Sequence, residues 1–159
     1  MGAGDDPLEW PHVHVTPFDK EQGDANKIAE YFPVMHFDCV HGSQVMEHLH
    51  HPTNFLQQCL HITKPGGWVV MTVPDFDLYE QGHWPSRFNP DHKTTWSLWR
   101  DKAPTKAPHM FVPSLKKIFP TLQCGLQCSN YDWLKRGTDQ TWKKEDRVEA
   151  FIEILIQKQ

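Results

Sequence analysis

Histidine and carboxylate side chains gather early in this sequence, where they could bind a metal ion or move a proton. Glu47 is followed by His48, His50 and His51. This order differs from the HExxH pattern, in which two histidines one helical turn apart bind zinc. The spacing therefore predicts no metal site and favours a polar helix entrance. A metal-dependent hydrolase built on the histidines is the weakest of three functions that the sequence leaves open.

A second group of polar and aromatic residues lies between residues 76 and 113, where neither a strand period nor a helix period is sustained. Long irregular segments inside compact domains are usually functional or disordered, and the aromatic content argues against disorder. The segment is expected to form a lid or acceptor pocket, or else a packed excursion over the core. The residues that would line such a pocket are Tyr79, His83, Trp84, Asn89, Asp91, His92 and Trp96.

Three side chains in or beside this segment are candidates for a catalytic base: Asp75, His83 and His92. His92 is favoured because Asp91-His92 follows a turn-forming Asn-Pro pair. The sequence does not decide among the three, because a base is assigned first by its distance from the proton that it removes.

The N-terminal region carries weaker signals of ligand binding. Gly2 and Gly4 form a G-x-G, which allows a close approach of the backbone to a ligand but is also common in ordinary turns. Asp19 and Asp24 lie past an expected strand, where a carboxylate can accept hydrogen bonds from ribose hydroxyls. Each is equally compatible with a solvated loop.

The helices and strands that must position these residues are predicted from hydrophobic periodicity and from the positions of proline and glycine. The central unit runs from Phe37 to Asp75 as strand, loop, helix and strand. Its Lys64-Pro65-Gly66-Gly67 is expected to end the helix, and its apolar run 68–73 to form a strand covered on both faces. The other expected elements are a strand at 12–15, a helical turn at 28–32, a strand at 37–40, a loop at 41–44, a turn at 45–49, a helix from Pro52 to Leu60, a short helix at 113–119, and strands at 122–129 and 148–157.

The order FDCVHGSQVMEHL, a helix, then KPGGWVVMTVPD resembles the later half of the nucleotide-binding core of class I S-adenosylmethionine-dependent methyltransferases. The likeness is strong over about forty residues. It implies an α/β, Rossmann-like sheet that is mostly parallel with an antiparallel C-terminal strand. It also implies S-adenosylmethionine as the cofactor.

Under this resemblance several residues acquire expected roles. Gly2 and Gly4 are similar to the glycine-rich loop under the methionine part of the cofactor. Gly23-Asp24-Ala25 is similar to the loop whose aspartate reaches the adenine amino group, and the resemblance makes Asp19 a candidate ribose ligand. Glu47 and His48 match a frequent Glu-His pair that braces the helix entrance. The loop that lines the methionine end would be His41, Gly42 and Ser43.

Under this resemblance the family's first strand is missing, because only Met1 stands before Gly2. The chain is then either an N-terminally shortened member with a rearranged sheet or a truncated fragment. A missing central strand leaves backbone groups to be covered, so a homo-oligomer that covers this edge is a possible partner arrangement.

Composition bounds the remaining choices. The 159 residues fit a single methyltransferase-like domain, 1–159. Sixteen basic against twenty acidic side chains give a net charge of -4, which argues against a nucleic-acid partner. No signal peptide or membrane span is apparent, so a cytosolic protein with no membrane partner is expected.

The sequence thus favours methyl transfer from S-adenosylmethionine to an unidentified acceptor, a small molecule in the simplest case. The main alternative is a non-catalytic binding or assembly module that has lost full cofactor binding.

Overall fold

The structure is a computed structural model that describes residues 1–2, 9, 11–103, 106–129 and 149–159. The described residues form two sheets and a few short helices, joined by loops. The helical elements are η1 (Ala25–Lys27), α1 (Ile28–Tyr31), η2 (Met46–His48), α2 (Pro52–Ile62) and η3 (Val112–Lys117). The strands are β1 (Phe37–Ser43), β2 (Thr63–Pro74), β3 (Thr95–Ser97), β4 (His109–Phe111), β5 (Gln123–Ser129) and β6 (Glu149–Gln157).

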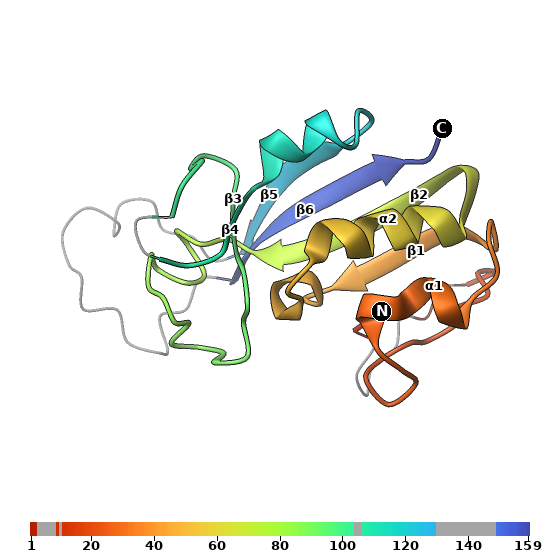
Figure 1. Ribbon diagram of the computed structural model, residues 1–159, viewed down its shortest axis with the longest axis horizontal. Helices are drawn as coiled ribbons and strands as arrows, with labels where there is room; N and C mark the ends of the chain where they lie inside the picture. The colour runs from red at the N-terminus through yellow and green to blue at the C-terminus, as the bar shows by residue number, and fades with distance from the viewer. Residues whose placement is uncertain (3–8, 10, 104–105, 130–148) are drawn as a thin grey trace.

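The main sheet has the order β1-β2-β6-β5 (Figure 1). β1 and β2 are parallel and joined through α2, the usual way to connect parallel neighbours. β6 lies between β2 and β5 and is antiparallel to both, so β1, β2 and β5 run in one direction. The predicted mostly parallel sheet with an antiparallel C-terminal strand is confirmed.

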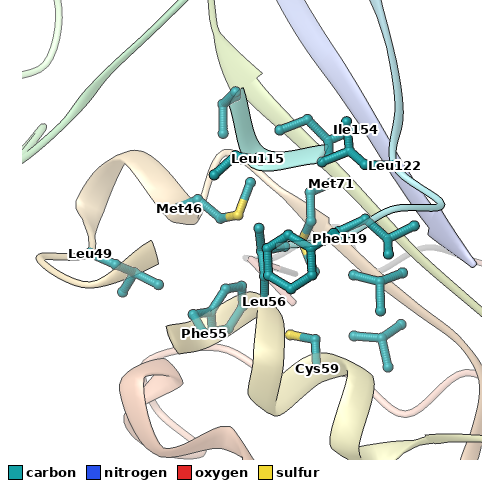
Figure 2. Close-up of a cluster of buried hydrophobic side chains, with 14 of the residues drawn as sticks. Met46, Leu49, Phe55, Leu56, Cys59, Met71, Leu115, Phe119, Leu122 and Ile154 are labelled. Atoms are coloured by element: carbon teal, nitrogen blue, oxygen red, sulfur yellow. The ribbon is translucent and has the colours of Figure 1, made fainter. Parts of the chain in front are cut away.

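One face of this sheet is buried under α2 and η3. Pro52 occupies the first turn of α2, and the helix ends where Thr63 Oγ1 donates to the carbonyl of Cys59 at 2.7 Å. Its apolar stripe faces the sheet. Figure 2 shows the residues that meet there: Met46, Leu49, Phe55, Leu56, Cys59, Met71, Leu115, Phe119, Leu122 and Ile154.

The opposite face of the sheet is only half-buried. Along β2, Val69 and Met71 are buried, whereas the alternate residues Trp68 and Val70 are partly exposed. Along β6, buried Ile154 is likewise followed by partly exposed Leu155. The prediction that residues 68–73 are covered on both faces was therefore wrong. A continuous apolar run does not reveal by itself which of its alternate side chains find partners.

The far edge of β1 carries one short backbone contact. The ammonium of Met1 donates to the carbonyl of His41 at 2.6 Å, and the amide of Ser43 donates to the carbonyl of Met1 at 3.3 Å. This is the pattern of a parallel bridge opposite Gly42. No strand among the described residues pairs with the rest of this edge.

Three local predictions need correction. Residues 12–15 form no strand, because no neighbouring strand offers them a ladder, and Val13 is 58% exposed. The expected loop at 41–44 is strand as far as Ser43, and Lys64–Gly67 belongs to β2 because α2 already ends at Ile62. Within 76–113 the two short parallel strands β3 and β4 were missed, since three residues are too few to show a period.

Candidate functional site

The carboxyl ends of β1 and β2 meet at one edge of the sheet, which is where open α/β sheets bind ligands. η2 follows β1 at this edge. The long segment after β2 returns to the same place and adds a two-stranded sheet, β3 with β4. The two chain segments that the sequence marked for their histidines therefore meet in space.

Backbone hydrogen bonds hold the two segments together. The amides of Lys93 and Thr94 both donate to the carbonyl of Glu47, at 2.6 and 3.1 Å. Nδ1 of His48 lies 3.3 Å from the carbonyl oxygen of Asp91. These contacts fix the side chain of His92 relative to η2.

Four side chains form a cluster at this junction: Glu47, His48, Glu80 and His92. Nδ1 of His92 contacts Oε1 of Glu80. Oε1 of Glu47 lies 4.0 Å from Nε2 of His92 and 3.9 Å from Nε2 of His48. The two imidazole rings are 5.0 Å apart, edge to face. Two imidazoles and two carboxylates thus meet at one place, with one of each contributed by η2 and one of each by the segment after β2.

Burial dominates the electrostatics of this cluster. Glu47 is 0% exposed, and burial, with a smaller contribution from the Glu80 charge, raises its pKa to about 8. Neither of its carboxylate oxygens has a hydrogen-bond partner in the part of the chain that the structure describes. Burial, and after it the neighbouring His92, lowers the pKa of His48. Burial thus favours the neutral forms of Glu47 and His48.

A cavity of about 1000 Å³ lies along the far edge of β1. It draws residues from both faces of the strand: Val40, which belongs to the core, and Cys39 and His41 on the other side. Met1, Gly2 and Ser43 line its end at the carboxyl terminus of β1. Its volume suits a small ligand of cofactor size.

Gly2, His41 and Ser43, three of the predicted cofactor residues, line this cavity. Gly2 has φ +67°, and a Cβ there would lie 2.5 Å from the carbonyl oxygen of Ser43, so only glycine fits. Gly42 faces the core instead, because its Cβ would lie 2.5 Å from the sulfur of Met71.

The other predicted cofactor residues are not among those that line the cavity. Asp24 is exposed and caps η1, with its carboxylate accepting from the amide and the side chain of Asn26 at 2.9 and 2.8 Å. Asp19 Oδ1 accepts from the amide of Lys20 at 2.6 Å. Ala25 packs partly buried against the core, and Gly4 lies outside the described residues.

The three candidate bases occupy different environments. Asp75 is buried at the end of β2, and its Oδ1 accepts from the amides of Asp77 and Leu78 at 3.0 and 2.9 Å. His83 is half-buried, with its amide bonded to the carbonyl of Glu80. Only His92 belongs to the four-residue cluster.

Sequence reasoning missed Glu80 and the joint role of Glu47. Glu80 lies in an irregular segment without periodicity, so no local pattern marks it as buried. The only signal was the unusual density of charged and aromatic residues around it.

Comparison with protein families matches residues 3–127 to a family described as "Methyltransferase domain". Among solved structures, the chain is similar to an S-adenosylmethionine-dependent methyltransferase from Archaeoglobus fulgidus, with a TM-score of 0.55, 16% identity, and coverage of 86% of this chain and 66% of that one. It is also similar to the YcgJ protein from Bacillus subtilis, with a TM-score of 0.51, 13% identity, and coverage of 86% and 70%. A comparison with curated proteins gives no match.

At these identities the structural likeness shows the fold alone. The chain spans 66% and 70% of the lengths of these two structures. No described helix is long and apolar enough to cross a bilayer.

Proposed function

We propose that this chain, which belongs to the class I S-adenosylmethionine-dependent methyltransferases, transfers a methyl group from that cofactor to a small-molecule acceptor. The observation that carries the proposal is the cavity at the carboxyl end of β1, which Gly2, His41 and Ser43 line together. The family match over residues 3–127 supports the cofactor.

The residues present fit the amino-acid end of the cofactor. Gly2 brings backbone against Ser43 without a side chain between them, so a ligand in the cavity can approach both main chains. For the adenosine end we propose Asp19 and Asp24, whose carboxylates would exchange their present partners, Lys20 and Asn26, for ligand groups.

When bound, S-adenosylmethionine supplies an electrophilic sulfonium methyl group, and the protein supplies orientation and exclusion of water. We propose that the segment 76–113 forms the acceptor side. Its His92 is held at Nδ1 by Glu80 and is therefore the best positioned of the predicted catalytic residues. His83 and Asp75 are the alternatives, although the Asp75 carboxylate already supports its own turn.

Titration calorimetry with S-adenosylmethionine, and with its demethylated product, tests the cofactor site on the folded full-length chain. Binding is expected, and Asp24→Ala should weaken it by about 10-fold or more through loss of a charge-assisted hydrogen bond. The matched control is Glu21→Ala, an exposed carboxylate in the same loop that should leave the affinity unchanged. A folded chain that binds neither compound would contradict the proposed function.

A second candidate is a non-catalytic assembly module, and the open edge of β1 favours it. Apart from the Met1 bridge, no strand in the part of the chain that the structure describes pairs with this edge, and such an edge beside an apolar cavity is a template for another strand. For this candidate the proposed occupant is a second copy of the chain, which would cover this edge.

Light scattering separates the two candidates. A stable monomer that binds the cofactor supports the enzyme, whereas an obligate dimer that ignores the cofactor supports the module. Cys39→Lys places an exposed charge at the open edge and should abolish edge-to-edge pairing. Gln127→Lys, on the exposed surface of β5, is the control at the opposite edge of the sheet.

A further inference from the structure

We propose that Glu47, His48 and His92 form a binding site for a divalent transition-metal ion. One ligand atom from each side chain lies within 4.8 Å of the other two. Oε1 of Glu47 lies 3.9 Å from Nε2 of His48 and 4.0 Å from Nε2 of His92. The proposal concerns ion binding alone and does not depend on methyl transfer. While the ion is bound, the Nε2 lone pair of His92 is occupied, and the role of base in methyl transfer would pass to His83 or Asp75.

The orientation of both imidazoles suits metal binding. A carbonyl oxygen can only accept a hydrogen bond, so Nδ1 of His48 carries the proton that it donates to Asp91. Nδ1 of His92 donates in the same way to the carboxylate of Glu80. Both rings therefore turn an unprotonated Nε2 toward Glu47. A histidine held at Nδ1 by a carboxylate or a carbonyl is the usual support for a ligand that binds metal through Nε2.

Glu47 supplies an independent observation. Its side chain is only 1% exposed and points into the cluster, yet both oxygens lack a hydrogen-bond partner within the described residues. Buried polar groups in folded proteins are nearly always paired, because an unpaired buried carboxylate loses its hydrating water and gains no hydrogen bond in exchange. A cation between Glu47 and the two imidazoles would satisfy it.

The ligand set indicates the class of ion. Two imidazoles and one carboxylate suit zinc and neighbouring first-row metals, whereas magnesium and calcium prefer oxygen ligands. Zinc bonds of about 2.0–2.1 Å in a tetrahedral site place ligand atoms about 3.3 Å apart. The observed 3.9 and 4.0 Å require only a small inward rotation of the side chains.

The site would also keep an open position. Three protein ligands leave a fourth tetrahedral position for water or another oxygen ligand. The His48 side chain is 33% exposed, so this side of the cluster is accessible to solvent, while Glu47 and His92 close the inner side.

Metal titration of the full-length chain tests the proposal. The protein is freed of metal with a chelator and titrated with Zn²⁺ by calorimetry, and with Co²⁺ by visible absorption. One ion per chain is expected, with Co²⁺ bands typical of a four- or five-coordinate nitrogen and oxygen site. Bound Zn²⁺ should also raise the unfolding temperature, because it binds the folded state.

Variants locate the ion. His48→Ala alters a partly exposed residue and should weaken Zn²⁺ binding by about 100-fold or more, and Glu47→Gln should do the same without changing the side-chain volume. Glu80→Gln removes only the charged partner of His92 and should cost about 10-fold to 100-fold. His50→Ala is the matched control, an exposed histidine two residues from His48 that should bind like the unchanged chain.

Two results would overturn the site. One is a folded wild-type chain that binds no Zn²⁺ or Co²⁺, which would make Glu47 a neutral buried acid. The other is equal affinity in wild type, Glu47→Gln and His48→Ala, which would assign the ion to other histidines. Circular dichroism of each variant establishes that it is folded. If the buried variants do not fold, the Zn²⁺ affinity of His48→Ala, which alters a partly exposed residue, still tests the site.

Discussion

The two faces of the main sheet differ, although the same strands build both. The face under α2 and η3 buries alternate residues of β2 and β6 almost completely, whereas the other face leaves Trp68, Val70 and Leu155 half-exposed. Since hydrophobic stabilisation follows the apolar area removed from water, most of the folding energy comes from the first face. The cavity along the edge of β1 draws on both faces, through Val40 of the core and through Cys39 and His41 on the other side.

The largest effect expected from this comparison concerns two neighbouring residues of β6. Ile154→Ala removes a side chain that is 0% exposed and should lower the free energy of unfolding by about 2 to 5 kcal/mol. Leu155→Ala, on the half-exposed face, should cost about 1 kcal/mol. Urea unfolding measures both variants, and equal losses would mean that the second face is covered in solution.

A buried carboxylate should make stability depend on pH. The pKa of Glu47 in the folded chain is about 8, above its ordinary value of 4.5, so the folded state keeps a proton that the unfolded chain releases. In metal-free protein, this contribution is fully present below about pH 4.5 and is lost as the pH rises through 8.

The expected loss is about 2 to 4 kcal/mol, because each unit of pKa difference corresponds to about 1.4 kcal/mol. Urea unfolding of the metal-free chain at pH 5 and pH 8.5 measures it. Glu47→Gln should flatten the difference, and a variant that keeps the full slope would place the titration elsewhere.

Two glycines sharpen the comparison between the faces. A Cβ at Gly42 would meet the sulfur of Met71 at 2.5 Å, so Gly42→Ala should destabilise by about 1 to 3 kcal/mol. A Cβ at Gly125 would meet nothing within 4 Å, so Gly125→Ala should be neutral or slightly stabilising. Thermal unfolding of the two variants checks this, and the opposite order would contradict the assignment of faces.

The smallest effect is expected at the exposed end of β1. Lys64 Nζ donates to both carboxylate oxygens of Asp38 at 2.8 and 2.9 Å, and this bond lowers the pKa of Asp38. The pair is solvated, so Asp38→Asn should hardly change the unfolding midpoint at physiological salt. A large shift would mean that this end of the strand is shielded from water.

The part of the fold that sequence could predict is the part stabilised locally. Pro52 and the apolar stripe after it determine α2, and the β-branched, apolar composition of residues 148–157 favours β6, although their periodicity also allows a helix. The final sheet order, the covered face and the strands β3 and β4 depend on contacts between distant segments, which periodicity does not record.

The candidate site divides in the same way. His92 could be favoured from the turn before it, and His41 and Ser43 from the strand predicted at 37–40, although the structure extends that strand to include both. The partnership of Glu47 with His92 could not, because the two residues are 45 positions apart in the sequence and are brought together by contacts between segments, such as the hydrogen bonds from the amides of Lys93 and Thr94 to the Glu47 carbonyl. A motif search reads spacing along the chain, whereas these ligands are neighbours only in space.

The position of β6 has a consequence for biosynthesis. β2 ends at Pro74 and β5 at Ser129, and neither pairs with the other, because β6, the last strand in the chain, lies between them. During synthesis, β2 can pair with β6 only after residues 149–157 have emerged, long after β1, α2 and β2 themselves. Such late, long-range pairing slows folding and exposes strand edges to aggregation, so chaperone dependence during synthesis is expected.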